Sequence, residues 1–138
     1  MERHLHQRYG SEHGARAYRH KYERSVSRRL SNRRELAIVD RALAEAGVRG
    51  RVLDCPCGAG RLTPTILSHA DHVTAIDLSG AMVDEARDAL AALDAGTRLD
   101  FAVASVTDLP FEDDHFDAAV CHRLIHHLAD ASDRAAVF

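Results

Sequence analysis

The chain changes character at Arg51, and the pattern that follows limits its possible folds more than any other feature. From that point short apolar runs alternate with stretches of helical periodicity, and turn residues separate them. We predict four strands, over residues 51–55, 72–76, 99–104 and 116–121. Strands that alternate with helices indicate a parallel, doubly wound sheet of the α/β class. The residues that end such strands should converge on one crevice, and here they are Asp54, Asp77, Ala104 and Cys121.

Helical spacing of apolar residues precedes the strands and recurs between them. We predict helices over residues 15–30, 34–46, 60–69, 80–93, 124–128 and 131–138. Local signals support several of these ends. Gly47 is a suitable stop for the second helix, Pro64 fits a first helical turn, and Ser79 can cap the helix that follows it.

The chain has the length of one domain, with 138 residues of which 46% are apolar. No stretch approaches the roughly 18 apolar residues that a membrane span needs, so we expect no membrane partner. The first ten residues are polar and lack the apolar centre of a signal peptide. The three cysteines are an odd number without the spacing of a disulfide framework, which favours reduced thiols. We therefore expect a cytoplasmic protein.

Charge divides the chain into two parts. Residues 1–34 hold ten Lys and Arg against three Asp and Glu, a net charge of +7, whereas residues 35–138 carry −10. We interpret residues 1–34 as a basic, helical N-terminal arm and residues 35–138 as an α/β domain. The arm either recruits an anionic partner such as nucleic acid or packs as a solvated helix on the acidic domain. It lacks interleaved aromatic residues, so we favour packing and do not expect nucleic acid as a partner.

A glycine-containing loop follows the first predicted strand, with the sequence Asp54-Cys55-Pro56-Cys57-Gly58-Ala59-Gly60. Glycine lets a ligand approach the backbone, and a helix that begins after the loop offers amide donors. Nicotinamide and flavin enzymes also use such a loop. Asp54 separates the possibilities, because a carboxylate repels the pyrophosphate of a dinucleotide but attracts the cationic groups of S-adenosylmethionine. The alternative is that Asp54 only hydrogen-bonds its own turn.

Asp77 ends the second predicted strand and is the next acidic residue of interest. A carboxylate at this place can accept hydrogen bonds from both hydroxyls of a ribose, which would suit any adenosine ligand. It can also support the N-terminus of the helix that follows. The two roles are compatible, so Asp77 predicts an adenosine site without naming the ligand.

These motifs, together with two later ones, resemble the class I methyltransferase family. Its members have a strand ending in Asp-x-x-Cys-Gly-x-Gly, an acid followed by Ser-x-x-Met, then Leu-Pro-Phe, then Phe-Asp. The matching residues here are Asp54, Cys57, Gly58, Gly60, Asp77, Ser79, Met82, Leu109, Pro110, Phe111, Phe116 and Asp117. A bacterial subgroup with a Pro-Cys-Gly-x-Gly-Arg loop is most similar, and it also shares Cys121, Arg123, Leu124, His126 and His127. The resemblance covers about residues 50–138.

The resemblance implies a Rossmann-like sheet, S-adenosyl-L-methionine as cofactor and methyl transfer as the activity. Asp54, Gly58 and Gly60 would cradle the methionine part of the cofactor, and Asp77 would hold the ribose. The full set that it places at the cofactor is Asp54, Cys55, Pro56, Cys57, Gly58, Gly60, Asp77, Leu78, Met82, Ser105, Val106 and Cys121.

The adenine end of the cofactor would meet four of these residues. Leu78 and Met82 would pack against the ring, whereas Ser105 and Val106 would face its edge. The backbone carbonyl of Cys121 would lie near the cofactor ammonium group.

Two residues depart from the family pattern. Pro56 replaces the first glycine of the loop, which stiffens the loop and removes one amide donor. Ser105 stands where many members carry an acid that bonds the adenine amino group. Since a hydroxyl offers no charge, we expect weaker cofactor affinity from this change.

Catalysis depends on the methyl acceptor, because only a weak nucleophile such as a phenol needs a general base. His122 follows the fourth predicted strand and is our candidate base, and His126 and His127 are alternatives that can instead cap, pack or be solvated. Cys55-Pro56-Cys57 lacks the spacing of a zinc ligand pair, so we expect no metal.

The family fold has seven strands, and this chain supplies the first four. In the family's strand order the fourth strand lies beside the first on one side and a fifth on the other. Without the fifth, the fourth would form an exposed apolar edge, which natural proteins avoid. We favour a truncated product; a partner chain or self-association through that edge stays open. The expected function is methyl transfer to an unidentified small-molecule acceptor, with an inactive cofactor-binding module or fragment as the alternative. A nicotinamide-dependent oxidoreductase is disfavoured by Asp54 and by Leu109-Pro110-Phe111.

Overall fold

The predicted alternation of strands and helices is confirmed by the computed structural model, which describes residues 26–124, 128 and 132. Its strands are β1 (Arg51–Asp54), β2 (His72–Asp77), β3 (Leu99–Val103) and β4 (Ala118–Val120). Its helices are α3 (Val26–Glu45), α4 (Thr63–Leu67) and α5 (Gly80–Ala89), with a short 3-10 helix, η1 (Gly96–Arg98). Over the described part of the chain, no helix combines the length and the apolar character that a membrane span needs.

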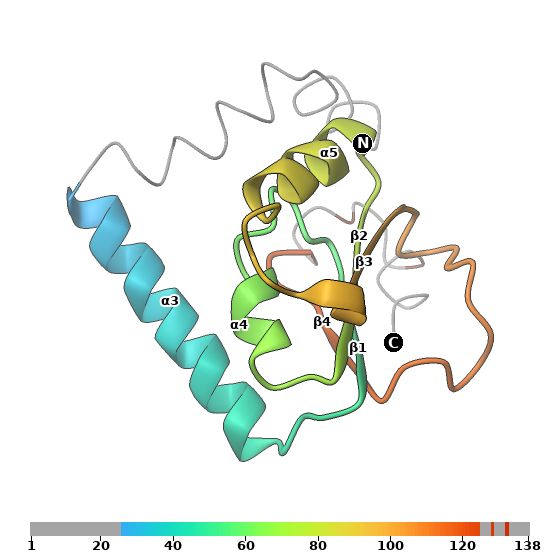
Figure 1. The fold of residues 1–138 in the computed structure, drawn as a ribbon, viewed down its shortest axis with the longest axis horizontal. Helices are drawn as coiled ribbons and strands as arrows, with labels where there is room; N and C mark the ends of the chain where they lie inside the picture. The colour runs from blue at the N-terminus through green and yellow to red at the C-terminus, as the bar shows by residue number, and fades with distance from the viewer. Residues whose placement is uncertain (1–25, 125–127, 129–131, 133–138) are drawn as a thin grey trace.

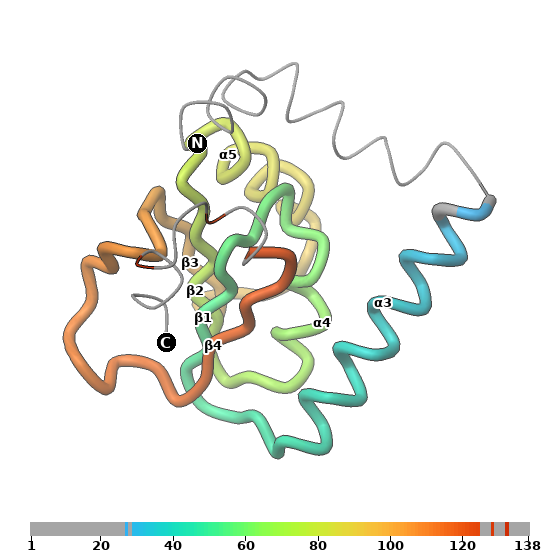
Figure 2. Tube along the Cα trace, turned by 180° about the vertical axis from the view of Figure 1, so that it is seen from behind, coloured from blue at the N-terminus to red at the C-terminus, as the bar shows by residue number. Residues whose placement is uncertain are grey.

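The four strands form one parallel sheet in the order β3-β2-β1-β4 (Figures 1 and 2). The chain moves outward from β1 to β2 and β3, and then returns to pair β4 with the other side of β1. Strand order therefore reverses between β1 and β4. In sheets of this kind, ligands bind beyond the carboxyl ends of the strands at the point of reversal. The predicted fold class and the position of the fourth strand beside the first are both confirmed.

The helices lie on one face of the sheet, with α3 outermost (Figure 1). Val52 of β1 and Val73 of β2 are fully buried there against Ile66 of α4. Leu43 joins the same cluster from α3, so this helix is held to the domain by apolar packing. Burial of such side chains contributes about 1.5–3 kcal/mol each, which fixes the layer of helices on the sheet.

The connection between β3 and β4 covers the opposite face. Phe111 and Phe116 pack there against Leu53 and Ile76. Their rings meet edge to face with centroids 4.9 Å apart, and the ring of His115 contacts both. Each of the Leu-Pro-Phe and Phe-Asp motifs thus supplies one phenylalanine to this face, while Leu109 is exposed.

Several predicted boundaries are wrong. Two separate helices were expected before β1, but α3 runs unbroken through residues 31–33, because no proline or glycine interrupts it there. Position 34, where we divided arm from domain, lies inside α3, and the division into two parts stays a prediction. The helix predicted from residue 60 begins only at Thr63, because Gly58 and Gly60 adopt left-handed φ values of 54° and 76°.

Other ends differ less. The structure shortens the predicted helix over 80–93 and the strands over 51–55, 99–104 and 116–121 by a few residues, and it extends the strand over 72–76 to Asp77. Gly47, with a φ of 63°, follows the end of α3, and Ser79 caps α5, both as predicted. The predicted helices over 15–30, 124–128 and 131–138 lie largely outside the described residues.

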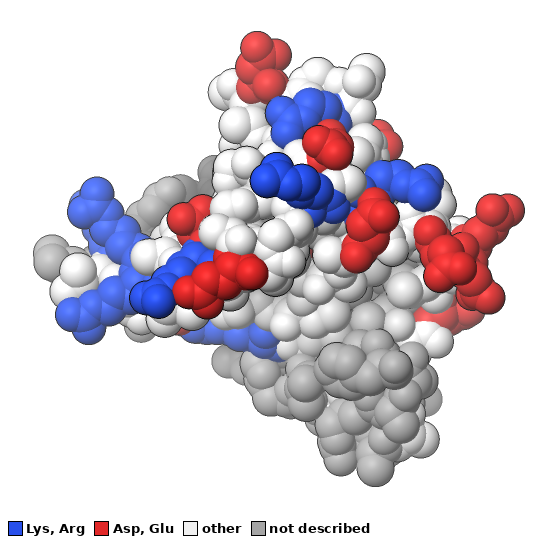
Figure 3. Space-filling view, turned by 90° about the horizontal axis from the view of Figure 1, so that it is seen from below, with Lys and Arg blue, Asp and Glu red and all other residues white. Residues whose placement is uncertain are grey.

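Charge is distributed unevenly over the surface (Figure 3). Basic side chains gather along the side formed by α3, and acidic side chains gather on the opposite side, formed by the connection after β3. The exposed residues concerned are Arg29, Arg33, Arg34, Asp108, Glu112, Asp113 and Asp114. Within the described residues, basic and acidic side chains therefore gather on different sides of the molecule.

Arg98 of η1 closes the end of α4. Its guanidinium donates to the carbonyl oxygens of Leu67, Ala70 and Asp71 at 2.8–3.1 Å. We expect Arg98→Met to lower the free energy of unfolding by about 1–2 kcal/mol, because charge-assisted bonds to helix-end carbonyls are lost. Urea denaturation measures this loss. Arg41→Met, which removes an exposed ion pair on α3, is the control and should change stability by less than about 0.5 kcal/mol; equal effects would contradict the capping role.

Candidate functional site

The carboxyl ends of all four strands lie along one edge of the sheet, which we call the carboxyl edge. Register places Asp54 beside Val120 and Asp77 beside Val103. Hydrogen bonds continue past the strand ends, from Cys55 N to the carbonyl of Val120 at 3.0 Å and from Ala104 N to the carbonyl of Asp77 at 3.1 Å. The structure therefore brings together the strand-end residues that the sequence predicted would meet.

Asp54 lies beneath the β1–α4 loop, almost completely buried. Its Oδ2 accepts a hydrogen bond from the Thr63 hydroxyl at 2.7 Å. Burial raises the pKa of this carboxyl from 3.8 to about 6, while the Thr63 bond opposes the rise and the charge of Asp77 adds to it. At neutral pH, Asp54 is therefore a buried anion with one hydroxyl donor. This is the local bonding that we had named as the alternative to ligand contact, and cofactor contact with Asp54 stays a prediction.

The amides of the β1–α4 loop are bound within the chain. Cys57 N donates to Ile76 O at 2.8 Å, Gly58 N to Asp77 Oδ2 at 3.0 Å, and Gly60 N to Cys57 O at 3.0 Å. The bonds of Cys57 and Gly58 hold the loop against the end of β2, and that of Gly60 closes a turn within the loop. The amide donors that we expected at the start of the following helix stay a prediction.

Gly60 is the point at which this loop meets α5. A Cβ atom at this position would lie 3.0 Å from Leu90 Cδ1 and 3.2 Å from the Cβ of Ala86, and the φ of 76° is one that side chains rarely adopt. Glycine is required here for close packing of the loop on α5. The loop is therefore positioned by its own hydrogen bonds and by the helix beside it.

Asp77 connects the loop with the start of α5. Its Oδ2 accepts from Gly58 N at 3.0 Å and its Oδ1 accepts from Ser79 N at 2.9 Å. Burial raises the pKa of this carboxyl, and the amide hydrogen bonds from Ser79, Gly58 and Leu78 oppose that rise. The carboxylate is half-buried, so it organises two turns while part of it faces outward.

The residues predicted at the adenine differ in their exposure. Leu78 is 40% exposed beside Asp77, whereas Met82 is buried against Ala59 of the glycine loop. Val106 packs with the aromatic cluster under the opposite face. Ser105 Oγ lies 2.9 Å from Thr107 Oγ1, so its hydroxyl already has a local partner. Leu78 is thus the apolar member of this group that is most open to a ligand.

The cysteines and Pro56 complete the predicted set. Cys55 and Cys57 are buried, Cys121 is exposed, and the Cys55–Pro56 peptide bond is cis. Burial raises the pKa of all three thiols, that of Cys55 to about 12, so they are neutral at physiological pH. Across the described residues, no group of three or more His, Cys, Asp or Glu side chains could hold a metal ion.

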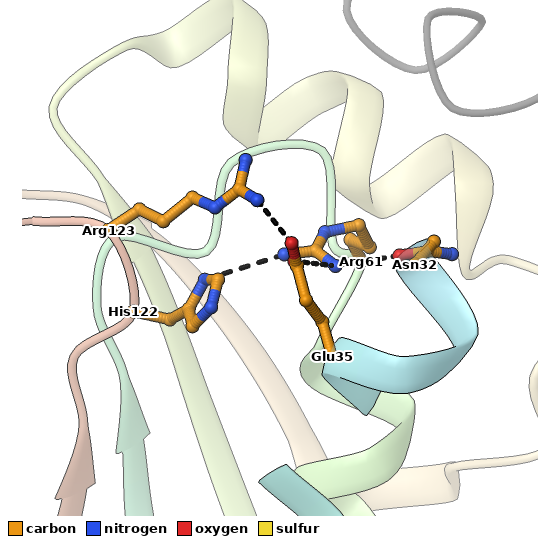
Figure 4. Close-up of polar contacts among 5 residues, drawn as sticks. All are labelled: Asn32, Glu35, Arg61, His122 and Arg123. Atoms are coloured by element: carbon orange, nitrogen blue, oxygen red, sulfur yellow. Dashed lines mark hydrogen bonds and ion pairs between the residues drawn. The ribbon is translucent and has the colours of Figure 1, made fainter. Parts of the chain in front are cut away.

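His122, our candidate base, lies within a polar cluster that the sequence did not predict (Figure 4). Its Nδ1 is 3.4 Å from Nη2 of Arg61. Nη1 of Arg61 donates to Asn32 Oδ1 at 2.7 Å and lies 3.1 Å from Glu35 Oε2. Glu35 Oε1 also accepts from Arg123. The alternatives His126 and His127 lie outside the described residues, and the role of His122 stays a prediction.

Sequence reasoning identified only one side of this cluster. Arg61 and Arg123 belong to the subgroup motifs, but Asn32 and Glu35 lie on α3 in no motif, and our domain boundary fell between them. The signal for these two residues is structural, because the Glu35 carboxylate lies half-buried between two arginines. This contact can be recognised only once α3 is placed beside the carboxyl edge.

Comparison with known proteins identifies the family of this chain. A family model described as "Methyltransferase domain" matches residues 52–138. The ubiquinone biosynthesis O-methyltransferase of Xanthomonas axonopodis pv. citri (strain 306) is 40% identical over 96 residues, which is 69% of this chain and 38% of that protein. Its counterpart in Xylella fastidiosa (strain 9a5c) is 37% identical over 81 residues, 58% of this chain and 32% of that protein. The chain thus spans less than half the length of these curated relatives.

A solved structure agrees on the fold. The magnesium protoporphyrin IX methyltransferase of Synechocystis PCC 6803, determined with bound SAH, superposes with a TM-score of 0.79. The match covers 99% of this chain and 65% of that one at 21% sequence identity. With the family match over residues 52–138, this chain belongs to the class I S-adenosylmethionine-dependent methyltransferases.

Proposed function

We propose that this chain binds S-adenosylmethionine at the carboxyl edge and presents its methyl group to a small-molecule acceptor. One observation carries the proposal: two carboxylates, Asp54 and Asp77, converge at the glycine loop where strand order reverses. Family membership supports the same assignment. A dinucleotide is a poorer match, because its pyrophosphate would meet negative charge at this loop.

The residues present fit this cofactor. Gly58 N donates to Oδ2 of Asp77 and Ser79 N to Oδ1, and the half-buried carboxylate has further lone pairs that can accept from ribose hydroxyls. Asp54 places a negative charge beneath the loop, where a sulfonium or ammonium group is favoured. The exposed side chain of Leu78 adjoins Asp77 and offers apolar contact to an adenine ring.

The chain's contribution to the reaction is positional. When bound, S-adenosylmethionine supplies a methyl group already activated by its sulfonium. The residues of the carboxyl edge would hold that group in a fixed direction toward an acceptor, which can lower the barrier by several kcal/mol. His122 would act as a base for a weakly nucleophilic acceptor.

The names of the curated relatives support a choice of acceptor class to test. Both curated relatives are ubiquinone biosynthesis O-methyltransferases, so an aromatic hydroxyl is the acceptor we propose to test first. The segments of those relatives beyond the matched part hold most of their length. The assignment of an acceptor to this chain therefore rests on the relatives' names and needs a direct assay.

Calorimetric titration with S-adenosylmethionine tests the proposal. We expect binding of S-adenosylmethionine and S-adenosylhomocysteine, since both carry the same adenosine and amino-acid groups, and no binding of NAD. A folded, monodisperse chain that binds neither adenosyl compound, or that binds NAD in their place, would contradict the proposed function. Transfer of a radiolabelled methyl group to catechol, used as a model acceptor, then separates an enzyme from a module that only binds.

A further inference from the structure

The carboxylate of Glu35, on α3, contacts arginines from two connections that leave the carboxyl edge of the sheet (Figure 4). Glu35 Oε2 lies 3.1 Å from Nη1 of Arg61, and Oε1 accepts from Nη2 of Arg123. Arg61 follows the glycine loop after β1, and Arg123 follows β4. These are the two connections on either side of the reversal in strand order, so Glu35 spans the place where a ligand is expected.

The surroundings strengthen the contact between Arg61 and Glu35. The Arg61 side chain is only 16% exposed and that of Glu35 24%, compared with 81% and 65% for the Arg41–Glu45 pair on the same helix. Partial removal from water strengthens the attraction between opposite charges. Asn32, one turn before Glu35, accepts a hydrogen bond from Arg61 beside this ion pair. Arg61 is therefore tied to α3 by two residues.

Arg123 adopts an unusual backbone conformation. Its φ of 59° lies in the left-handed region, which a residue with a side chain rarely occupies and which costs of order 1 kcal/mol or more. The next residue, Leu124, is buried, and the preceding residue, His122, lies against Arg61. The ion pair with Glu35 is a contact that can compensate for this conformation and hold the segment after β4 in place.

We propose that Glu35 is a positioning residue of the cofactor site, which clamps the β1–α4 loop to the segment after β4 through Arg61 and Arg123. This inference rests on the proposed function. The fold itself does not depend on the clamp, because α3 is also held by apolar packing of Leu43 and its neighbours. The clamp fixes the spacing of the two connections, so that the cofactor binds a site that is already ordered.

Hydrogen exchange of the full, cofactor-free chain tests the clamp directly. We expect Glu35→Gln to speed amide exchange in residues 57–62 and 120–124 by at least about threefold, since local opening follows the loss of a restraining contact. Glu45→Gln, which breaks the exposed pair on the same helix, is the matched control and should leave both segments unchanged. Equal exchange in the wild type and Glu35→Gln would overturn the clamp.

Cofactor affinity supplies the second measurement. We expect Glu35→Gln to bind S-adenosylmethionine about tenfold more weakly, the size of a typical coupling between two sites. Arg123→Met should show a similar loss, and the double variant little more than either, because both changes open one clamp. Faster exchange with unchanged affinity would overturn the positioning role. Absence of binding by the wild type would instead count against the proposed function, and the exchange comparison would still decide on the clamp.

Discussion

Asp77→Ala is expected to bind S-adenosylmethionine at least about 100-fold more weakly than the wild type. The carboxylate would lose its bonds to the ribose, and the amides of Gly58 and Ser79 would lose their acceptor. Hydrogen bonds to a charged group contribute about 1.5–3 kcal/mol each, so loss of two corresponds to this change in affinity or more. Calorimetric titration of the purified variant measures it.

Two further variants sharpen the result for Asp77. Asp77→Asn preserves the shape but must turn its amide NH₂ toward one of the two backbone N–H donors, so we expect most of the loss to remain. Asp84→Ala removes an exposed carboxylate from α5, where it pairs with Arg87, and should bind as the wild type does. Wild-type affinity in Asp77→Ala would remove Asp77 from the site and require another ribose-binding residue.

Asp54→Asn is expected to stabilise the fold at neutral pH. It should also remove part of the pH dependence of the free energy of unfolding. Because burial raises the pKa of Asp54 from 3.8 to about 6, the folded chain holds a proton between these values that the unfolded chain has released. The free energy of unfolding therefore falls as pH rises through this window, by roughly 3 kcal/mol, and stays lower above pH 6. Asparagine has no charge to bury and can still bond the Thr63 hydroxyl.

Urea denaturation at pH 4 and pH 7.5 checks this prediction. The variant should exceed the wild type by about 2 kcal/mol at pH 7.5 and by little at pH 4, and comparing the two proteins cancels all other titrating groups. Cofactor affinity should fall at the same time, because the buried negative charge is lost. A constant difference between the proteins at both pH values would show that Asp54 is not the titrating group.

The strands along the chain and the residues at their ends could be predicted because each depends on local sequence, whereas the place of the fourth strand beside the first came from the family resemblance. Alternation of apolar runs and turn residues locates strands, and parallel topology brings their ends together whatever the intervening loops do. Ser79 and Gly47 were identifiable for the same reason, since caps depend on residues a few positions away. The motif residues Asp54 and Asp77 needed no more than their place after a strand.

The rest depended on contacts between distant segments. The start of α4 at Thr63 follows from the glycine conformations and the packing of Gly60 on α5, which no local periodicity reveals. Glu35 is separated from Arg123 by 88 positions, and on its own it reads as a solvated helix residue. The amides of Cys57 and Gly58 donate to Ile76 and Asp77 of β2, 19 positions away, which no local pattern reveals.

Pairing of β1 with β4 has a consequence for how the chain folds. Residues 50 and 71, at the entry to β1 and β2, are 21 positions apart, whereas residues 51 and 117, at the entry to β1 and β4, are 66 apart. Closing the longer connection costs about 1 kcal/mol more in chain entropy. We therefore expect β4 to pair with β1 later than β2 does. Arg123 and His122 arrive with it, and the carboxyl edge is therefore complete only when the most distant pairing in the sheet has formed.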